Sequence, residues 1–426
     1  MSSFQAPQTL ADWLEYIEQL HPATIEMGLE RVREVYDRLN APKFCPLFIV
    51  GGTNGKGSTC TMLEATLQAA GYRTGKYLSP HLVRYNERVR IDGHDATDEV
   101  LITGFRAVEE ARSDTQLTYF EFTTLAAWVS FSQAGLDALI LEVGLGGRLD
   151  AVNIFEPDCS ILTSVAMDHM DYLGDTREQI GWEKAHIFRP GKAAICTEPQ
   201  PPQTVLDYAK EIGTDLQLIG RDFGFEAQDR QQWLFWSRAG KRSGLPYPCL
   251  RGANQLANAS ACIAALEALR ESLPVGAQDI RHGLLQAELP GRFQVLPGRP
   301  SVILDVGHNP HAAAVLRENL GNMGFYRRTF AVVGMLRDKD IRGVFEHLRG
   351  RIDIWYVATL ENPRGAQASE LAAALQEANA GGEVKLFQSP HEAYAAAEAE
   401  VLEDDRILVF GSFYTVAEVM QARGLI

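Results

Sequence analysis

The sequence predicts an α/β protein of two domains, and three observations support this prediction. The chain has 426 residues, which is too long for one ordinary core. The apolar run Phe48–Val50 leads into a glycine-rich turn, Gly51–Ser58, and then into a helical pattern. A Pro-Gly break at Leu289–Phe293 is followed by a renewed βα rhythm. We therefore expect an N-terminal P-loop-type ATPase domain with a mostly parallel sheet at residues 1–291. A smaller C-terminal Rossmann-like α/β domain is expected at residues 292–426.

Composition and charge narrow the class of protein. The chain is 46% hydrophobic and 22% charged, which is typical of a soluble globular protein, and its formal net charge is −15. An acidic surface argues against a general nucleic-acid or anionic-membrane binder. The sequence shows no apolar run of membrane-spanning length, no basic-then-apolar leader and no paired cysteines. We expect a cytoplasmic protein, monomeric because no exposed apolar stripe calls for a partner, with no nucleic-acid or membrane partner.

The first elements are two helices and the glycine-rich loop. Apolar stripes predict helices within Leu10–Leu39, interrupted at His21-Pro22. In the loop, glycines allow backbone N–H groups to face phosphate oxygens, and Lys56 adds a positive charge at a helix N-terminus. The usual GxxxxGK[ST] pattern is not matched strictly, because Val50 replaces a glycine and the hydroxyl arrives one residue late, at Ser58. The alternative is a plain βα turn with a solvated lysine.

Polar side chains follow the next expected strands. Leu136–Val143 is a nearly continuous apolar run that contains Glu142 close to its end. A carboxylate there is costly unless it binds a cation or is paired, for example with Arg148. Cys159–Val165 predicts a strand that runs into Asp168 and His169. A ligand or catalytic role for this histidine and an ordinary satisfied polar role are both open.

The remaining elements complete the two domains. Helices are expected from Thr118 through Phe131 and over Leu250–Leu269, with a small antiparallel patch within Gln200–Gly244. For Asn258, in the second of these helices, capping or solvation is the alternative to a binding role. The C-terminal domain is expected to contain the strands Val302–Val306, Thr329–Val333, Ile352–Val357 and Arg406–Phe410. The first of them leads into another polar loop, Asp305–Pro310.

Several segments together carry a family resemblance. They are GTNGKGS at 52–58, YLSPHLVRYNERVR at 77–90, TYFEFTTLA at 118–126, LEVGLGGRLDAVN at 141–153, TSVAMDHMDYLG at 163–174, EKAHIFR at 183–189, LPGRFQ at 289–294 and DVGHNPHA at 305–312. In this order they resemble the folylpolyglutamate synthase/dihydrofolate synthase family of Mur-type amide ligases. The resemblance implies an ATP-dependent ligase that adds L-glutamate to dihydropteroate and to reduced folates through an acyl phosphate. It implies ATP and Mg²⁺ as cofactors, with K⁺ as a further candidate cation.

The resemblance also implies residue roles. ATP would be held by Thr53, Asn54, Gly55, Lys56, Gly57 and Ser58, with Asn258, Arg292 and Asp305 contributing from elsewhere in the chain. Magnesium would be bound by Ser79, Glu142 and His169. Lys56, Lys184 and His169 would be catalytic, and Lys184 would carry a carbamate (N6-carboxylysine). The pterin or folate would contact Thr24, Ile25, Glu26, Met27, Thr118, Tyr119, Phe120, Glu121, Leu149, Asp150 and Ala151, and His308 would lie near the glutamate site.

One departure from the family pattern and three alternative functions are visible. The motif EKAGI reads EKAHI here, so His186 replaces a glycine, and crowding near Lys184 is expected rather than loss of function. A folylpolyglutamate synthase without the first ligation, or a Mur-type ligase acting on a UDP-sugar, would use the same parts. A nucleotide-dependent switch without ligation is a further alternative. The strand-end Glu142 and His169 favour an enzyme.

Overall fold

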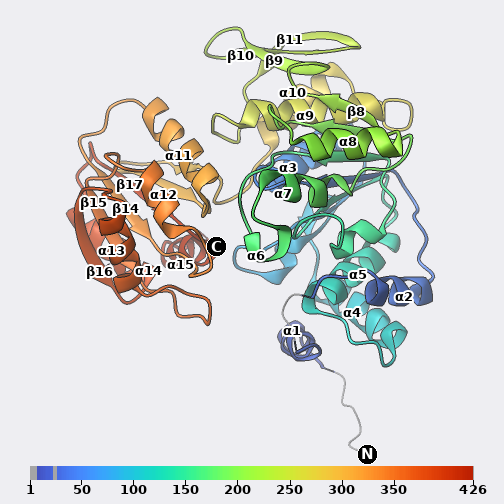
Figure 1. The fold of residues 1–426 in the computed structure, drawn as a ribbon, viewed down its shortest axis with the longest axis horizontal. Helices are drawn as coiled ribbons and strands as arrows, with labels where there is room; N and C mark the ends of the chain where they lie inside the picture. The colour runs from blue at the N-terminus through green and yellow to red at the C-terminus, as the bar shows by residue number, and fades with distance from the viewer. Residues whose placement is uncertain (1–6, 23–25, 426) are drawn as a thin grey trace, which may run out of the picture. The chain divides into compact units, whose positions relative to one another are not determined.

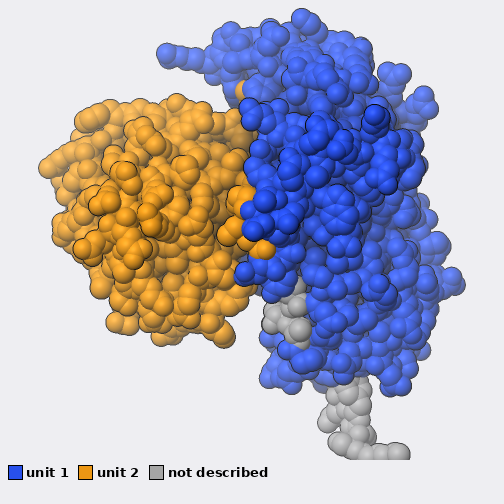
Figure 2. Space-filling view, viewed as in Figure 1, with its two compact units in different colours: residues 1–165, 171–247, 257–287 blue, residues 166–170, 248–256, 288–426 orange. Residues whose placement is uncertain are grey.

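The chain divides into two compact units, which Figure 2 colours separately. The computed structural model describes residues 7–22 and 26–425. Unit 1 consists of Met1–Val165, Asp171–Tyr247 and Ala257–Ala287, and unit 2 of Ala166–Met170, Pro248–Leu256 and Glu288–Ile426. The boundary expected at residues 291 and 292 stays a prediction. The short segment Ala166–Met170 packs with unit 2, although unit 1 residues flank it in the sequence.

The core of unit 1 is an eight-stranded sheet in the order β4-β3-β2-β5-β1-β6-β7-β8. Figure 1 labels its edge strand β8 and helices that belong to the same unit, such as α3, α7 and α8. The strands are β1 (Leu47–Gly51), β2 (Thr74–Tyr77), β3 (Val89–Ile91), β4 (His94–Asp95), β5 (Ala138–Glu142), β6 (Cys159–Leu162), β7 (Ala193–Cys196) and β8 (Asp215–Leu218). All neighbours are parallel except the pairs β2–β3 and β3–β4. Every residue of β1 and β5 is buried, as the apolar runs at Phe48–Val50 and Leu136–Val143 predict, and this includes Glu142 at the end of β5.

The helices expected within Leu10–Leu39, after the glycine-rich loop, from Thr118 and within Leu250–Leu269 are all present. The helices in this part of the chain are α1 (Leu10–Gln19), α2 (Glu30–Leu39), α3 (Lys56–Ala69), α4 (Asp98–Arg112), α5 (Tyr119–Ser132), α6 (Met170–Leu173), α7 (Arg177–Ala185), α8 (Gln203–Ile212), α9 (Gln255–Ala268) and α10 (Ala277–Gln286). Two single turns of 3₁₀-helix lie at Tyr85–Arg88 and Ala151–Ile154. The expected antiparallel patch is the sheet of β9 (Phe223–Ala227), β10 (Gln232–Ser237) and β11 (Gly240–Pro246). Helix α8 and strand β8 lie in the same stretch and were not anticipated.

Unit 2 contains a six-stranded sheet in the order β12-β13-β17-β14-β15-β16, parallel except at β12–β13. Its strands are β12 (Gln294–Leu296), β13 (Ser301–Asp305), β14 (Thr329–Val333), β15 (Ile354–Ala358), β16 (Glu383–Phe387) and β17 (Arg406–Phe410). Its helices are α11 (Pro310–Asn322), α12 (Ile341–His347), α13 (Ala368–Glu377), α14 (Pro390–Glu400) and α15 (Phe413–Ala422). The strands expected at 329–333 and 406–410 have the observed bounds, and the other two are within two residues.

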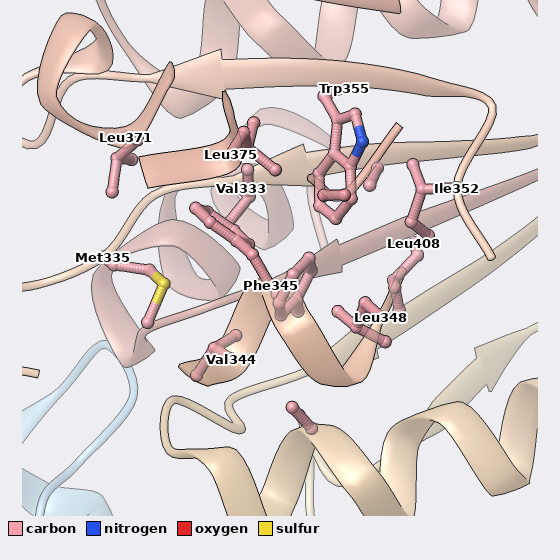
Figure 3. Packing of buried hydrophobic residues seen from close by; sticks show 14 of the residues in the cluster. Val333, Met335, Val344, Phe345, Leu348, Ile352, Trp355, Leu371, Leu375 and Leu408 are labelled. Atoms are coloured by element: carbon pink, nitrogen blue, oxygen red, sulfur yellow. The ribbon is translucent and has the colours of Figure 1, made fainter. Parts of the chain in front are cut away.

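The core of unit 2 lies between its sheet and helices α11 to α13 (Figure 3). Phe345 packs edge-on against Trp355 with ring centroids 5.3 Å apart, and both side chains are fully buried. The indole N–H of Trp355 donates to the carbonyl oxygen of Gly381 at 2.8 Å, so its one polar atom is satisfied. Across residues 7–22 and 26–425, no helix is long and apolar enough to cross a membrane.

Candidate functional site

The glycine-rich loop joins β1 to α3 and has backbone angles that require glycine. Gly52 has φ +139°, and a Cβ there would lie 2.0 Å from the hydroxyl oxygen of Thr163. Gly55 has φ +92° and is the N-cap of α3, where a Cβ would lie 2.7 Å from Oδ1 of Asn258. Asn258 is buried in α9, so the structure brings this expected nucleotide residue to the loop. The two glycines therefore let the chain turn sharply onto the helix N-terminus.

The end of β6 holds the loop in place. The backbone N–H of Thr53 donates to the carbonyl of Ser164 at 2.8 Å, and that of Asn54 donates to the Ser164 hydroxyl oxygen at 3.0 Å. The Thr163 hydroxyl donates to the Asn54 carbonyl at 2.7 Å. Lys56 reaches back to the carbonyls of Gly52 and Thr53 at 3.0 and 3.3 Å. Because the ammonium lies across the loop, the solvated lysine of a plain βα turn is not what the structure shows.

Two of the three expected metal ligands lie together at the carboxyl edge of the same sheet. Glu142 ends β5 and is 3% exposed, and its Oε2 accepts a hydrogen bond from the backbone N–H of Ser79 at 3.0 Å. The alternative partner, Arg148, instead pairs with Glu183 at 2.9 Å. A carboxylate and a neighbouring hydroxyl are oxygen donors of the kind Mg²⁺ prefers, so these residues fit a magnesium ion. Among the described residues, no group of three or more His, Cys, Asp and Glu side chains forms a metal cluster.

Lys184 and His186 lie at the end of α7. Lys184 is only 5% exposed, which is unusual for a lysine. The His186 ring stacks on Tyr208 of α8, with centroids 4.0 Å apart, and its Nδ1 lies 2.7 Å from the Trp182 carbonyl oxygen. Burial lowers the pKa of His186. Since His186 has φ −67°, the glycine of the family motif is not needed here for backbone conformation. The ring packs between α7 and α8, and this is how the replacement is accommodated.

The described parts of the three segments expected to contact the pterin converge on the Gly144–Gly146 turn. A Cβ at Gly144 would meet the Phe120 ring at 2.6 Å, and one at Gly146 would lie 3.9 Å from the terminal methyl of Met27. Asp150 fixes the same turn by accepting the backbone N–H groups of Leu145 and Val152 at 2.8 and 3.0 Å. Burial raises the pKa of Asp150 to about 6. Leu149 and Ala151 flank this aspartate, and Thr24 and Ile25 lie outside the described residues.

Thr118 and Glu121 cap the N-terminus of α5. The Thr118 hydroxyl oxygen accepts the backbone N–H of Glu121 at 3.3 Å, and Glu121 Oε2 accepts the backbone N–H of Thr118 at 2.8 Å. This reciprocal pair is a capping box. Tyr119 lies between them, and Arg88 stacks over its ring at 5.5 Å. Burial raises the pKa of Tyr119 to about 12.

Two of the expected residues of unit 2, Asp305 and His308, lie at the polar end of β13, and Arg292 lies just before β12. Asp305 ends β13 and accepts the backbone N–H groups of Phe293 and Gly307 at 2.9 and 2.7 Å. Burial raises the pKa of Asp305, and the charge of Arg292 opposes this shift. Arg292 stacks over Phe413 at 5.4 Å. Burial lowers the pKa of His308 to about 4, and the charge of Lys339 acts in the same direction.

His169 belongs to a charged cluster within unit 2. Lys339 pairs with Asp168 at 3.0 Å and lies 3.4 Å from Nε2 of His169. Asn309 donates to the other oxygen of Asp168 at 3.0 Å. Burial alone would raise the pKa of Asp168, but the charges of His169 and Lys339 hold it well below its usual range. His169 has φ +51°, an uncommon conformation for a residue other than glycine.

Sequence reasoning gave no role to three residues that contact the expected site residues: Asn309 and Lys339, which contact Asp168, and Arg31, which pairs with Glu121 at 3.1 Å. Lys339 follows β14 in the polar stretch Arg337–Asp340, so the strand-end rule that singled out Glu142 and His169 could also have found it. Asn309 caps α11 and lies inside the polar loop after β13. Arg31 carries no sequence signal beyond its place in the first turn of α2.

The fold and the loop define a class of protein: a P-loop-type nucleotide-binding unit followed by a second α/β unit. Comparison with known families agrees with this description. Residues 50–266 match the Mur ligase middle domain, and residues 291–413 match the Mur ligase, glutamate ligase domain.

Individual relatives narrow the class further. The chain is 48% identical over 418 residues to the dihydrofolate synthase/folylpolyglutamate synthase of Escherichia coli K12, covering 98% of this chain and 96% of the relative. It is 41% identical to the Haemophilus influenzae protein of the same name, covering 97% of each. The solved structure of E. coli FolC in complex with DHPP and ADP superposes with a TM-score of 0.94 at 47% identity and 99% coverage of both chains. The chain belongs to the dihydrofolate synthase/folylpolyglutamate synthase family of Mur ligases.

Proposed function

We propose that this chain is an ATP-dependent ligase that joins L-glutamate to dihydropteroate and to reduced folates. The observation that carries the proposal is the 48% identity, over 98% of the chain, to a dihydrofolate synthase/folylpolyglutamate synthase. A bifunctional folylpolyglutamate synthase/dihydrofolate synthase solved with Mn, AMPPNP and L-glutamate has a TM-score of 0.91 and 46% identity to this chain. The fold and the nucleotide loop described above are those such a reaction needs.

The chemistry follows from the residues of the loop. A carboxylate is a poor electrophile, so an oxygen of the substrate carboxylate would attack the γ-phosphorus of ATP, ADP would leave, and an acyl phosphate would form. The backbone N–H groups of the first turn of α3, at Lys56, Gly57 and Ser58, and the Lys56 ammonium would contact the nucleotide phosphates and stabilise the charge that develops during transfer. The glutamate amine then attacks the acyl carbon, the amide bond forms, and inorganic phosphate leaves. Asn258, Arg292 and Asp305 are proposed to contact the nucleotide.

We assign the divalent cation to Ser79, Glu142 and His169, with Mg²⁺ as the physiological ion. The cation supplies charge neutralisation at the phosphates when it is bound. Glu142 is suited to this role because it is buried at a strand end next to Ser79. Lys184 is proposed to carry a carbamate, which replaces a buried cation by an oxygen donor. The pterin contacts are proposed at residues 24–27, 118–121 and 149–151, and the glutamate contact at His308. The chain is proposed to be a cytoplasmic monomer that binds neither nucleic acid nor membranes.

A substitution of Lys56 tests the phosphate role. We expect Lys56→Ala to lower turnover by at least about a hundredfold, because the variant loses the one full charge of the loop. The measurement is phosphate release from ATP in the presence of glutamate, with dihydropteroate and a reduced folate monoglutamate offered in separate reactions. Lys210→Ala is the matched control, since Lys210 is exposed in α8. A folded Lys56→Ala protein with wild-type activity would rule out the proposed role.

The identity of the products decides between the proposed substrates and the alternatives. Mass analysis should find a glutamyl adduct of both dihydropteroate and the reduced folate. An adduct of the reduced folate alone would limit the activity to folylpolyglutamate synthesis. Phosphate release that depends on a UDP-sugar would indicate the peptidoglycan-type ligase, and release indifferent to glutamate would indicate a nucleotide switch.

A further inference from the structure

Arg31 contacts two chain segments, one of them five residues before it and the other 90 residues after it in the sequence. It lies in the first turn of α2, and its Nη2 donates to Oε1 of Glu121 at 3.1 Å. The same nitrogen donates to the carbonyl oxygen of Glu26 at 3.1 Å, and Nη1 pairs with the Glu26 carboxylate. One guanidinium group therefore contacts the segment before α2 and the first turn of α5.

The pair with Glu121 is the more buried of the two ion pairs. The side chain of Glu121 is 5% exposed, that of Arg31 is 24% exposed and that of Glu26 is 46% exposed. Glu121 also accepts the backbone N–H of Thr118, so its two oxygens serve the helix cap and Arg31 at once. A buried carboxylate is stable only when it is paired, and within the described residues Arg31 is the cation that contacts it.

The contacts of Arg31 leave one of its nitrogen atoms without a hydrogen bond. Nε of Arg31 is buried and has no hydrogen-bond partner within the described residues. A buried donor without an acceptor costs free energy, so the ion pairs of Arg31 with Glu26 and Glu121 form in spite of that cost. The planar guanidinium fixes the directions of two carboxylates relative to each other. These two ion pairs indicate that Arg31 fixes the position of Glu26 relative to the first turn of α5.

The two joined segments are both proposed pterin contacts. Met27 follows Glu26, and its terminal methyl lies beside Gly146, at 3.9 Å from the position of a Cβ there. Phe120 precedes Glu121, and its ring covers Gly144 of the same turn. Met27 and Phe120 thus lie near the Gly144–Gly146 turn, and Arg31 contacts the residue next to each of them, Glu26 and Glu121.

We propose that Arg31 is a positioning residue for the pterin site, because it fixes Glu26 and Met27 against the start of α5. The proposal rests on the assignment of the pterin contacts above. Arg31 acts through Glu26 and Glu121 and not on the nucleotide loop. Its loss should therefore weaken binding of the pterin substrate and leave ATP binding unchanged.

The test compares Arg31→Gln with Arg33→Gln, a control on the same helix whose side chain is exposed. We expect the KM for dihydropteroate and its Kd, measured by fluorescence titration, to rise about tenfold in Arg31→Gln, as for the loss of a part-buried charge pair. The KM for ATP and kcat should stay within about twofold of wild type. Arg31→Lys keeps the charge but not the planar fork, so it should recover only part of the loss.

The outcomes separate positioning from general damage. Equal rises in KM for ATP and for dihydropteroate, or unchanged dihydropteroate binding in Arg31→Gln, would overturn the proposal. In a double-mutant cycle, Glu26→Gln should add little to Arg31→Gln if the two act together. Full additivity would show that Arg31 does not act through Glu26. Binding of dihydropteroate to the wild-type protein is measured first. If the wild-type protein does not bind it, the proposed substrate is wrong, and this failure is distinct from an effect of Arg31.

Discussion

At the scale of residues, backbone conformation explains the glycine-rich loop better than its match to a motif does. The departure at Val50 is harmless because this residue is a buried strand position and does not turn the chain. Gly52 and Gly55 have positive φ angles and neighbours that leave no space for a Cβ. The sequence predicted the loop from its glycines, but which glycines are essential depends on Thr163 and Asn258, residues distant in the sequence.

We predict that Gly55→Ala disrupts nucleotide binding while Gly71→Ala does not. Both residues have similar φ angles, +92° and +88°, so both alanines should cost about 1–2 kcal/mol in backbone strain. Only at Gly55 would the new Cβ meet Asn258, whereas nothing lies within 4 Å at Gly71. Titration with AMPPNP and urea unfolding of both variants check this. Equal nucleotide affinities in the two variants would contradict the role of the Gly55–Asn258 contact.

At the scale of elements, the sequence predicted the helices and strands that have a clear local hydrophobic pattern. It did not predict the contacts that depend on residues distant in the sequence. The apolar runs predicted the positions of β1, β5, β14 and β17 to within about two residues, because a strand that is buried on both faces has a nearly continuous apolar sequence. The edge strand β16 was missed, since Val384 and Leu386 are exposed and the strand alternates without an apolar run. The capping box of α5 was visible as Thr118 and Glu121, but its link to Arg31 was not.

We predict that His186→Gly, which restores the family motif, destabilises the protein without improving catalysis. The variant loses the stack on Tyr208 that joins α7 to α8 and gains conformational freedom in the unfolded chain. The free energy of unfolding should fall by about 1–2 kcal/mol. Urea unfolding and kcat for ligation measure the two effects, and His186→Tyr, which retains an aromatic ring, is the control. A several-fold rise in kcat for His186→Gly would show instead that the histidine crowds Lys184.

At the scale of the whole molecule, the two units were predictable, but the membership of the segment Ala166–Met170 was not. Composition and the Pro-Gly break indicated two α/β domains, and each unit has its own sheet. The short segment packs with unit 2 because Asp168 contacts Asn309 and Lys339, which lie 141 and 171 positions later in the sequence. No local sequence pattern encodes contacts between residues so far apart. Individual candidate residues could therefore be named from the sequence, but which of them contact one another could not.

Stability against acid is a property of the whole molecule to which paired carboxylates in both units contribute. Asp158 precedes β6 and accepts hydrogen bonds from the backbone N–H of Leu47 at 3.0 Å and from Lys192 at 3.2 Å, and it also pairs with Lys43. Burial alone would raise the pKa of Asp158, but these donors lower it below 3.8. Asp405 in unit 2 is likewise lowered, against the effect of burial, by Arg328. The folded state therefore prefers the ionised carboxylates.

We predict that Asp158→Asn is destabilising at neutral pH and less so in acid. The stabilisation from Asp158 is fully present well above 3.8, its pKa in the unfolded chain, and is lost as the pH falls through its lower pKa in the folded state. The variant should lose about 1.5–3 kcal/mol of unfolding free energy at pH 7, the range for hydrogen bonds to a charged group. Urea unfolding between pH 7 and pH 3 should show the gap to wild type narrowing, whereas Asp114→Asn, at an exposed aspartate, should show no gap at any pH. A gap that stays constant over this range would mean that Asp158 stabilises unit 1 by packing and not by its charge.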